Sequence, residues 1–231
     1  FASYRKNDAT LNDDGTIRTL LKSGYHRTPT EMEKKNNILQ TTFGGNLQWG
    51  NYGFRVGLTA LYTQFDRPVM PNTAQIYRAN YPQGYDFWNV GVNYGYVNPR
   101  WSANGETAMG GNGAVATLNS VSFQPSKRLS LTAIQRYYGS RYWALHANAF
   151  SEGGQMRNEI GMLIGANWTV NRFLTLAAYT DYAYFRKPRY RASAASSAWD
   201  NYVSAVYTRR NLSFLARYRL KIRQKDNADH T

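Results

Sequence analysis

A column of basic side chains near the end of the chain carries the clearest chemical signal. Alternate residues in this stretch are cationic: Arg217, Arg219, Lys221, Arg223 and Lys225. Because alternate side chains of a strand share a face, the spacing predicts a strand with one cationic and one largely apolar face. Cations about 7 Å apart repel one another, so acidic side chains, a docked loop or mobile anions must compensate them.

The same alternation places other charged side chains on the face that this column shares. The basic ones are Arg55 and Arg136, and the acidic ones are Glu106, Glu159 and Asp181. One interpretation is a basic lumen that attracts anions, or polyanions such as DNA. The other is a packed interior in which arginines pair with carboxylates and nothing passes. The sequence favours neither interpretation over the other.

A dense polar cluster lies in the segment 22–36. Its members are Tyr25, His26, Arg27 and Thr28. Thr28 could cap a short helix that has Pro29 at its first position and Glu31 at its third. The segment could fold into a lumen, where it would gate a pore or contact a ligand. A structured surface loop is the favoured interpretation.

A second basic cluster lies further along the chain. It consists of Arg186, Lys187, Arg189 and Arg191. On an outer loop these cations would lie near anionic lipopolysaccharide headgroups, and Lys and Arg contacts to phosphate also carry non-specific nucleic-acid binding. A solvated charged loop is the favoured interpretation.

Catalysis and metal binding have little support. The histidines His26, His146 and His230 are far apart, and Ser23 with His26 is a weak pair. The residue types in segment 12–15 are typical of a turn, and this interpretation is favoured over a calcium-binding loop. The chain has no cysteine, which excludes disulfides, Fe–S clusters and Cys-ligated zinc. We expect no catalytic residue, no metal, no cofactor and no enzyme activity.

Period-two alternation predicts an all-β chain. In 159–170 every second residue from Ile160 to Val170 falls on one, mostly apolar face, and 173–184 repeats the pattern after the short turn 171–172. With a first strand at 1–5, we expect eleven strands, the others being 39–49, 52–65, 86–98, 101–109, 114–124, 129–138, 159–170, 173–184, 200–208 and 211–224. The alternation is weak in 114–124 and in 200–208.

Connection length alternates as well. Short turns are expected at 50–51, 99–100, 125–128, 171–172 and 209–211, and longer links at 6–36, 66–85, 139–157 and 185–199, with the short Gly-rich link 110–113 as an exception. Short turns on one rim and long loops on the other are typical of antiparallel up-and-down transmembrane β-barrels. We therefore expect residues 1–231 to form one incomplete barrel segment, with 6–36 able to fold into its lumen.

Composition agrees with this fold class. The 231 residues include 15% aromatics, and 28 Lys and Arg against 14 Asp and Glu give a net charge of +14. Such aromatic content argues against disorder. No uninterrupted apolar stretch reaches the roughly 20 residues of a transmembrane helix.

Several segments resemble one family. They are 23–31 with Lys34 and Lys35, then 44–47, the stretch 142–152 containing Asn148, Ala149 and Phe150, and the Arg-rich final strand. Together they are similar to the C-terminal membrane-barrel portion of the Bacteroidota helix-hairpin-helix (ComEA-related) proteins. The helix-hairpin-helix motif itself is not in this chain, so no DNA-contacting residue carries over. The resemblance implies an outer-membrane location and a link to DNA handling at the envelope.

The expected function is an outer-membrane channel or translocation component with a basic lumen. The alternative is a structural or accessory subunit of an outer-membrane complex with a plugged lumen. Expected partners are outer-membrane lipid and lipopolysaccharide of a Gram-negative bacterium, together with other outer-membrane proteins and, as an open question, nucleic acid.

Overall fold

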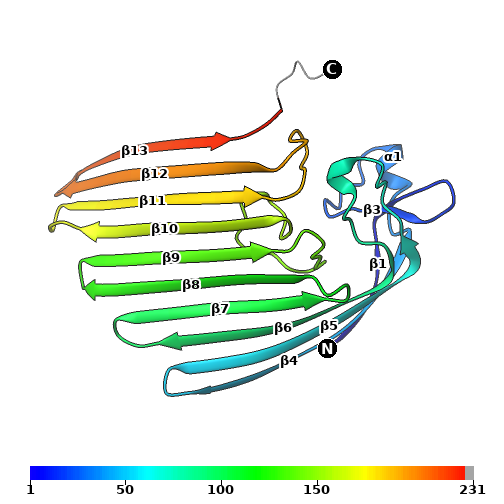
Figure 1. The fold of residues 1–231 in the computed structure, drawn as a ribbon, viewed down its shortest axis with the longest axis horizontal. Coiled ribbons are helices and arrows are strands. Elements are labelled where there is room, and N and C mark those ends of the chain that lie inside the picture. The colour runs from blue at the N-terminus through cyan, green and yellow to red at the C-terminus, as the bar shows by residue number, and fades with distance from the viewer. Residues whose placement is uncertain (227–231) are drawn as a thin grey trace.

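The main strands lie side by side in one sheet, in the order in which they follow one another in the chain (Figure 1). The computed structural model describes residues 1–226. Its main strands are β1 (Ala2–Asn7), β4 (Ile38–Asn51), β5 (Phe54–Val69), β6 (Gly84–Val97), β7 (Trp101–Gly110), β8 (Val115–Ser126), β9 (Leu129–Tyr138), β10 (Glu159–Thr169), β11 (Leu174–Phe185), β12 (Ser196–Arg209) and β13 (Leu212–Arg223). Each neighbouring pair is antiparallel. The all-β, up-and-down prediction is confirmed, and so are the eleven strands, including the weakly alternating β8 and β12.

Connection lengths separate the two rims of the sheet. At one rim, on the left of Figure 1, short turns join β4 to β5, β6 to β7, β8 to β9, β10 to β11 and β12 to β13. At the other rim lie the links 8–37, 70–83, 111–114, 139–158 and 186–195. The predicted alternation of short and long connections is therefore confirmed.

The first hairpin turns two residues later than predicted. Gly50 and Asn51 were expected to form the turn, but they pair with Arg55 and Phe54 inside the ladder. The turn is made by Tyr52 and Gly53, whose φ angles are 45° and 85°. Two-residue hairpins favour positive φ at both positions, and Gly53 supplies the second without a side chain, where a Cβ would lie 2.4 Å from the Val97 carbonyl oxygen.

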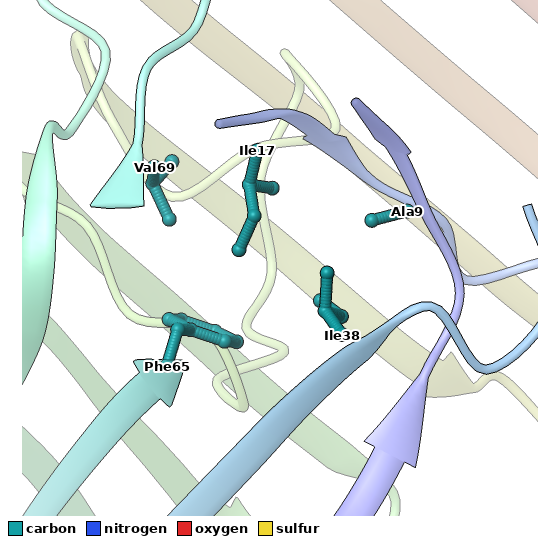
Figure 2. Packing of buried hydrophobic residues seen from close by; sticks show 5 residues of the cluster. All are labelled: Ala9, Ile17, Ile38, Phe65 and Val69. Carbon is teal, nitrogen blue, oxygen red and sulfur yellow. The ribbon is translucent and has the colours of Figure 1, made fainter. Parts of the chain in front are cut away.

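The long segment before β4 holds elements that the sequence did not predict. Strand β2 (Ala9–Leu11) pairs with β3 (Ile17–Leu20), and a parallel bridge joins β3 to the end of β5. This hairpin buries the apolar cluster in Figure 2, formed by Ala9, Ile17, Ile38, Phe65 and Val69. The hairpin therefore packs against the long-link ends of β4 and β5.

The sheet has two chemically different faces. We call the side bearing most buried polar side chains, such as Thr63, Arg136 and Asp181, the inner face. The outer face exposes large apolar side chains, including Val92, Ile164, Trp168, Leu220 and Ile222. Within residues 1–226 the sheet does not close on itself, since β1 and β13 are its two edges.

One patch of the outer face is polar. Tyr94 donates to Asn119 Oδ1 (2.6 Å), and the Asn119 amide donates to Gln135 Oε1 (2.8 Å). This patch explains why the alternation of 114–124 is weak, because polar residues occupy both faces of β8.

Helix is limited to α1 (Pro29–Met32) and the 3-10 turn η1 (Ile76–Arg78) in the described residues. Neither has the length or the apolar character to cross a membrane.

Candidate functional site

A fully buried arginine lies on the inner face, two residues before the long-link end of β9. Arg136 on β9 pairs with Glu159 on β10 and, through both terminal nitrogens, with Asp181 on β11 at 2.7 and 3.1 Å. The guanidinium also lies 4.8 Å from the ring centre of Phe150. Register explains the grouping. Arg136 lies opposite Gly161 on β10, and β10 is the only strand between β9 and β11, which carries Asp181. This arginine is thus held between two carboxylates rather than facing open space.

Gly161 makes room for this arrangement. A Cβ at this position would lie 2.4 Å from the Arg136 guanidinium carbon. The arginine side chain therefore crosses β10 directly over the glycine, and any side chain there would displace it.

The basic column of β13 is largely paired. Arg219 binds both oxygens of Asp200 at 2.9 and 2.5 Å, and Lys221 binds Glu152 at 2.8 Å and lies 3.5 Å from Asp200. Arg223 binds Glu152 at 2.7 Å. Within residues 1–226, Arg217 has no carboxylate at ion-pair distance. Compensation of the column therefore comes from β12 and from a loop. It reaches Arg219, Lys221 and Arg223, and within residues 1–226 it leaves out Arg217 and Lys225, which follows the end of β13.

The acidic partners of the column were missed at the sequence level. Asp200 lies on β12, where alternation is weak, although its register with Asp181 would have placed it on the inner face. Glu152 lies in the link 139–158, and no periodic signal marks a loop residue. Side-chain partners supplied by loops depend on tertiary structure that spacing does not encode.

The link 139–158, which we call the inner loop, spans the inner face at the long-link rim. Glu152 contacts β13, as described above, and Trp143 packs on Phe87 of β6 with ring centres 4.4 Å apart. At the far end, the Gln40 amide of β4 donates to His146 Nε2 (3.1 Å). The inner loop therefore connects the two ends of the open sheet.

Electrostatics around His146 disfavour its protonated form. Burial lowers the pKa of His146, and the nearby cations Arg5 and Lys22 lower it further. The Gln40 side chain is oriented by Asn7, which donates to its carbonyl oxygen (2.5 Å). A neutral imidazole that accepts from Gln40 fits this environment.

The predicted loop cluster lies at the long-link rim beside β1. Thr28 caps α1, and its side chain and that of Glu31 form a reciprocal capping box, as predicted. His26 binds Asp8 (2.7 Å), and Arg27 lies over the Tyr25 ring at 4.1 Å. Hydrogen bonds from the Asn36 amide and the His26 ring hold the pKa of the Asp8 carboxyl below its ordinary value. The exposed Tyr25 and Arg27 match a surface loop.

The other predicted cations lie apart from one another. Arg55 is near the short-turn rim, where it donates to Asn104 Oδ1 (2.6 Å). In the link 186–195, three arginines lie over aromatic rings: Arg186 over Tyr137 (5.8 Å), Arg189 over Phe185 (3.4 Å) and Arg191 over Tyr190 (5.3 Å). The backbone of Lys187 bonds the Asn158 side chain. Arg186, Lys187 and Arg191 are exposed, as predicted for a solvated loop, whereas Arg189 is partly buried against Phe185.

Two cavities open at the long-link rim. One of about 730 Å³ is lined by the inner loop, by β3 with its following residues, and by Pro71, Tyr81 and Pro82. The other, of about 250 Å³, lies between the links 70–83, 139–158 and 186–195. Tyr81, Gln155 and Arg157 line both cavities.

Histidines and carboxylates are dispersed in the described part of the chain. Among residues 1–226, no three side chains of His, Asp or Glu gather closely enough to hold a metal ion. His26 and His146 each have a different partner, and His230 lies outside the described residues.

Comparison with known proteins identifies no family for the chain. No protein-family model and no curated protein matches the chain. Among solved structures, a NanC porin in a rhombohedral crystal form is similar, with 14% identity, a TM-score of 0.32, and coverage of 82% of this chain and 94% of the porin chain. The expected relation to helix-hairpin-helix proteins stays a prediction.

Proposed function

We propose that the chain forms the wall of an outer-membrane β-barrel that conducts anions through a basic interior. The observation that carries the proposal is the contrast between the two faces of the sheet. Strands β4 to β13 have 10 to 16 residues each, enough for tilted strands to cross a bilayer. The outer face exposes apolar side chains along them, as lipid contact requires.

The charge of the inner face supports anion preference. Arg217 on β13 has no acidic partner in the described residues, and Arg55 contacts an amide rather than a carboxylate. Both are exposed on the inner face. Cations that line a water-filled passage raise the local concentration of anions.

A matched pair of substitutions tests the membrane assignment. Leu176 points to the outer face of β11, and its neighbour Ala177 points to the inner face. Arginine on a lipid-facing strand position costs about 2–4 kcal/mol at the bilayer midplane and about 0–1 kcal/mol near the interfaces, and Leu176, the third residue of β11, lies between these limits. We expect Leu176→Arg to impair insertion into lipid vesicles and Ala177→Arg to insert nearly as wild type. Equal tolerance of both would contradict the barrel.

Conductance across a planar bilayer tests the channel. The full-length protein should give single-channel currents. In a KCl gradient, their reversal potential should be displaced from zero toward the chloride equilibrium potential. Silence from protein that has inserted would contradict conduction.

A plugged structural subunit is the second candidate function. The inner loop spans the inner face, and buried ion pairs surround Arg136. In this alternative the barrel is silent and its surface binds other outer-membrane proteins. Lipopolysaccharide contact by Arg186 and Arg191, and DNA passage through the lumen, remain proposals within either function.

A further inference from the structure

The 250 Å³ cavity at the long-link rim has a basic and aromatic lining. Its charged side chains are Arg157, Lys187 and Arg189, and its rings include Tyr77, Tyr81 and Tyr190. No Asp or Glu of residues 1–226 lines it. An all-cationic lining is costly unless an anion or water compensates it.

Arg157 is held by a ring instead of a carboxylate. Its guanidinium carbon lies 3.8 Å from the ring centre of Tyr81, and no acidic side chain of the described chain pairs with it. Burial lowers the pKa of Arg157. A bound oxyanion would supply the anionic partner that this half-buried guanidinium group lacks.

Arg189 has the same character on the opposite wall. It stacks on Phe185 at 3.4 Å, and its Nε donates to Ser196 Oγ (3.2 Å). Burial and the neighbouring Arg223 lower the pKa of Arg189, against a smaller opposite effect of Glu159 and Glu152. Neither acid lies within ion-pair distance of it.

The walls of the cavity are fixed to each other. The Asn158 side chain donates to the Lys187 carbonyl oxygen (2.8 Å) and accepts from the Lys187 amide (2.9 Å). Tyr77 and Tyr190 meet edge to face, with ring centres 5.8 Å apart. Three links are thus joined around one space, and a site arranged before binding loses less entropy when a ligand enters.

We propose that this cavity binds the carboxylate or phosphate group of a small polar molecule, with Arg157 and Arg189 as its two forks. Planar guanidinium groups match both oxyanions in geometry, and the tyrosine rings offer flat surfaces for the rest of the ligand. Its volume of about 250 Å³ lies just below the roughly 300–1,000 Å³ of known ligand sites, so it fits the anionic group and only a small part of a larger molecule. A larger molecule could extend past Arg157 into the adjoining 730 Å³ cavity.

Calorimetry on the full-length protein in neutral detergent micelles tests this site, and it requires no open channel. Inorganic phosphate and glucose 6-phosphate should bind saturably, whereas glucose should not. Loss of one charged hydrogen-bond donor should weaken binding about tenfold or more in Arg157→Gln and in Arg189→Gln. Arg157→Lys keeps the positive charge but loses the planar guanidinium group, so its affinity should lie between those of the wild type and Arg157→Gln. Arg210→Gln, in an exposed turn at the other rim, is the matched control and should bind as wild type.

A second measurement needs no variant. Phosphate should protect Arg157 and Arg189, but not Arg210, from modification by phenylglyoxal. Micelles containing lipid A distinguish the source of the oxyanion. If lipid A binds and its binding depends on both arginines, while soluble phosphates do not bind, then the site has the proposed chemistry and its ligand is a lipid headgroup. Absence of binding and protection with every probe, or wild-type affinity in both Gln variants, would overturn the proposal. Either result leaves the conductance test of the channel unaffected.

Discussion

At the residue scale, the inner face is governed by which charges have partners. Alternation alone placed Arg136, Glu159 and Asp181 on one face, and register brought them within hydrogen-bond distance. Spacing could not predict how deeply each side chain is buried: Arg136 has no exposed surface, whereas Arg217 is exposed. Arg136 is buried because Phe150 of the inner loop covers its guanidinium, whereas Arg217 lies on the edge strand β13, and neither circumstance has a periodic signal.

The buried ion cluster should be sensitive to loss of its cation. Arg136→Met leaves Glu159 and Asp181 buried without their shared partner, which costs about 3–5 kcal/mol for a buried pair broken on one side. Urea unfolding followed by tryptophan fluorescence would measure the loss of unfolding free energy. Arg210→Gln should change the unfolding free energy little, and a similarly small effect of Arg136→Met would show that the cluster is wet.

His146 predicts an acid-sensitive inner loop. Its pKa is lower in the folded protein than the ordinary 6.5, so the unfolded chain binds more protons between these two values. Stability from docking is therefore complete above about pH 6.5 and declines as the pH falls through this window. Protonation would also set two donors, the Gln40 amide and the imidazolium, against each other.

Limited proteolysis of the inner loop between pH 8 and pH 5 would measure this effect. Cleavage within 139–158 should increase on acidification in the wild type. His146→Gln stays neutral and keeps an acceptor for Gln40, so its cleavage should depend much less on pH. An equal dependence in both proteins would assign the effect to other groups.

At the element scale, the strands were predictable and the links were not. Long alternating runs such as β10 and β11 fix both strand identity and face, because a half-buried sheet needs period two. The turn at Tyr52 was misplaced by two residues, since Gly50 resembles a turn residue while Tyr at positive φ does not. The β2–β3 hairpin was missed because its strands have only three and four residues.

Glycine in β10 provides a test at this scale. A Cβ on Gly161 would overlap the Arg136 guanidinium, so Gly161→Ala should cost about 1–3 kcal/mol through overpacking. Gly45 in β4 has no atom within 4 Å of an added Cβ, and Gly45→Ala is the matched control. Urea unfolding of the two variants would compare them, and equal stabilities would show that Arg136 moves aside freely.

At the scale of the whole molecule, the inner loop compensates for an open sheet. Glu152 binds β13 and His146 contacts β4, so one link connects distant strands that share no ladder. The up-and-down order was predictable from alternating connection lengths, whereas the bridging loop was known only as a long link. In the proposed channel, conduction depends on the charges that the loop leaves unpaired.

Arg217 and Arg219 separate the two proposed functions. They face the same side of β13, but Asp200 holds Arg219, while no described acid pairs with Arg217. In an open lumen, Arg217→Glu should leave the fold intact. It should shift the reversal potential of reconstituted channels away from the chloride equilibrium potential, because an exposed cation on the passage is replaced by an anion. Arg219→Glu should instead loosen β13, since it sets a second carboxylate beside Asp200. If Arg217→Glu also prevents folding, then this end of the column belongs to a closed interior, and the structural-subunit function replaces the channel.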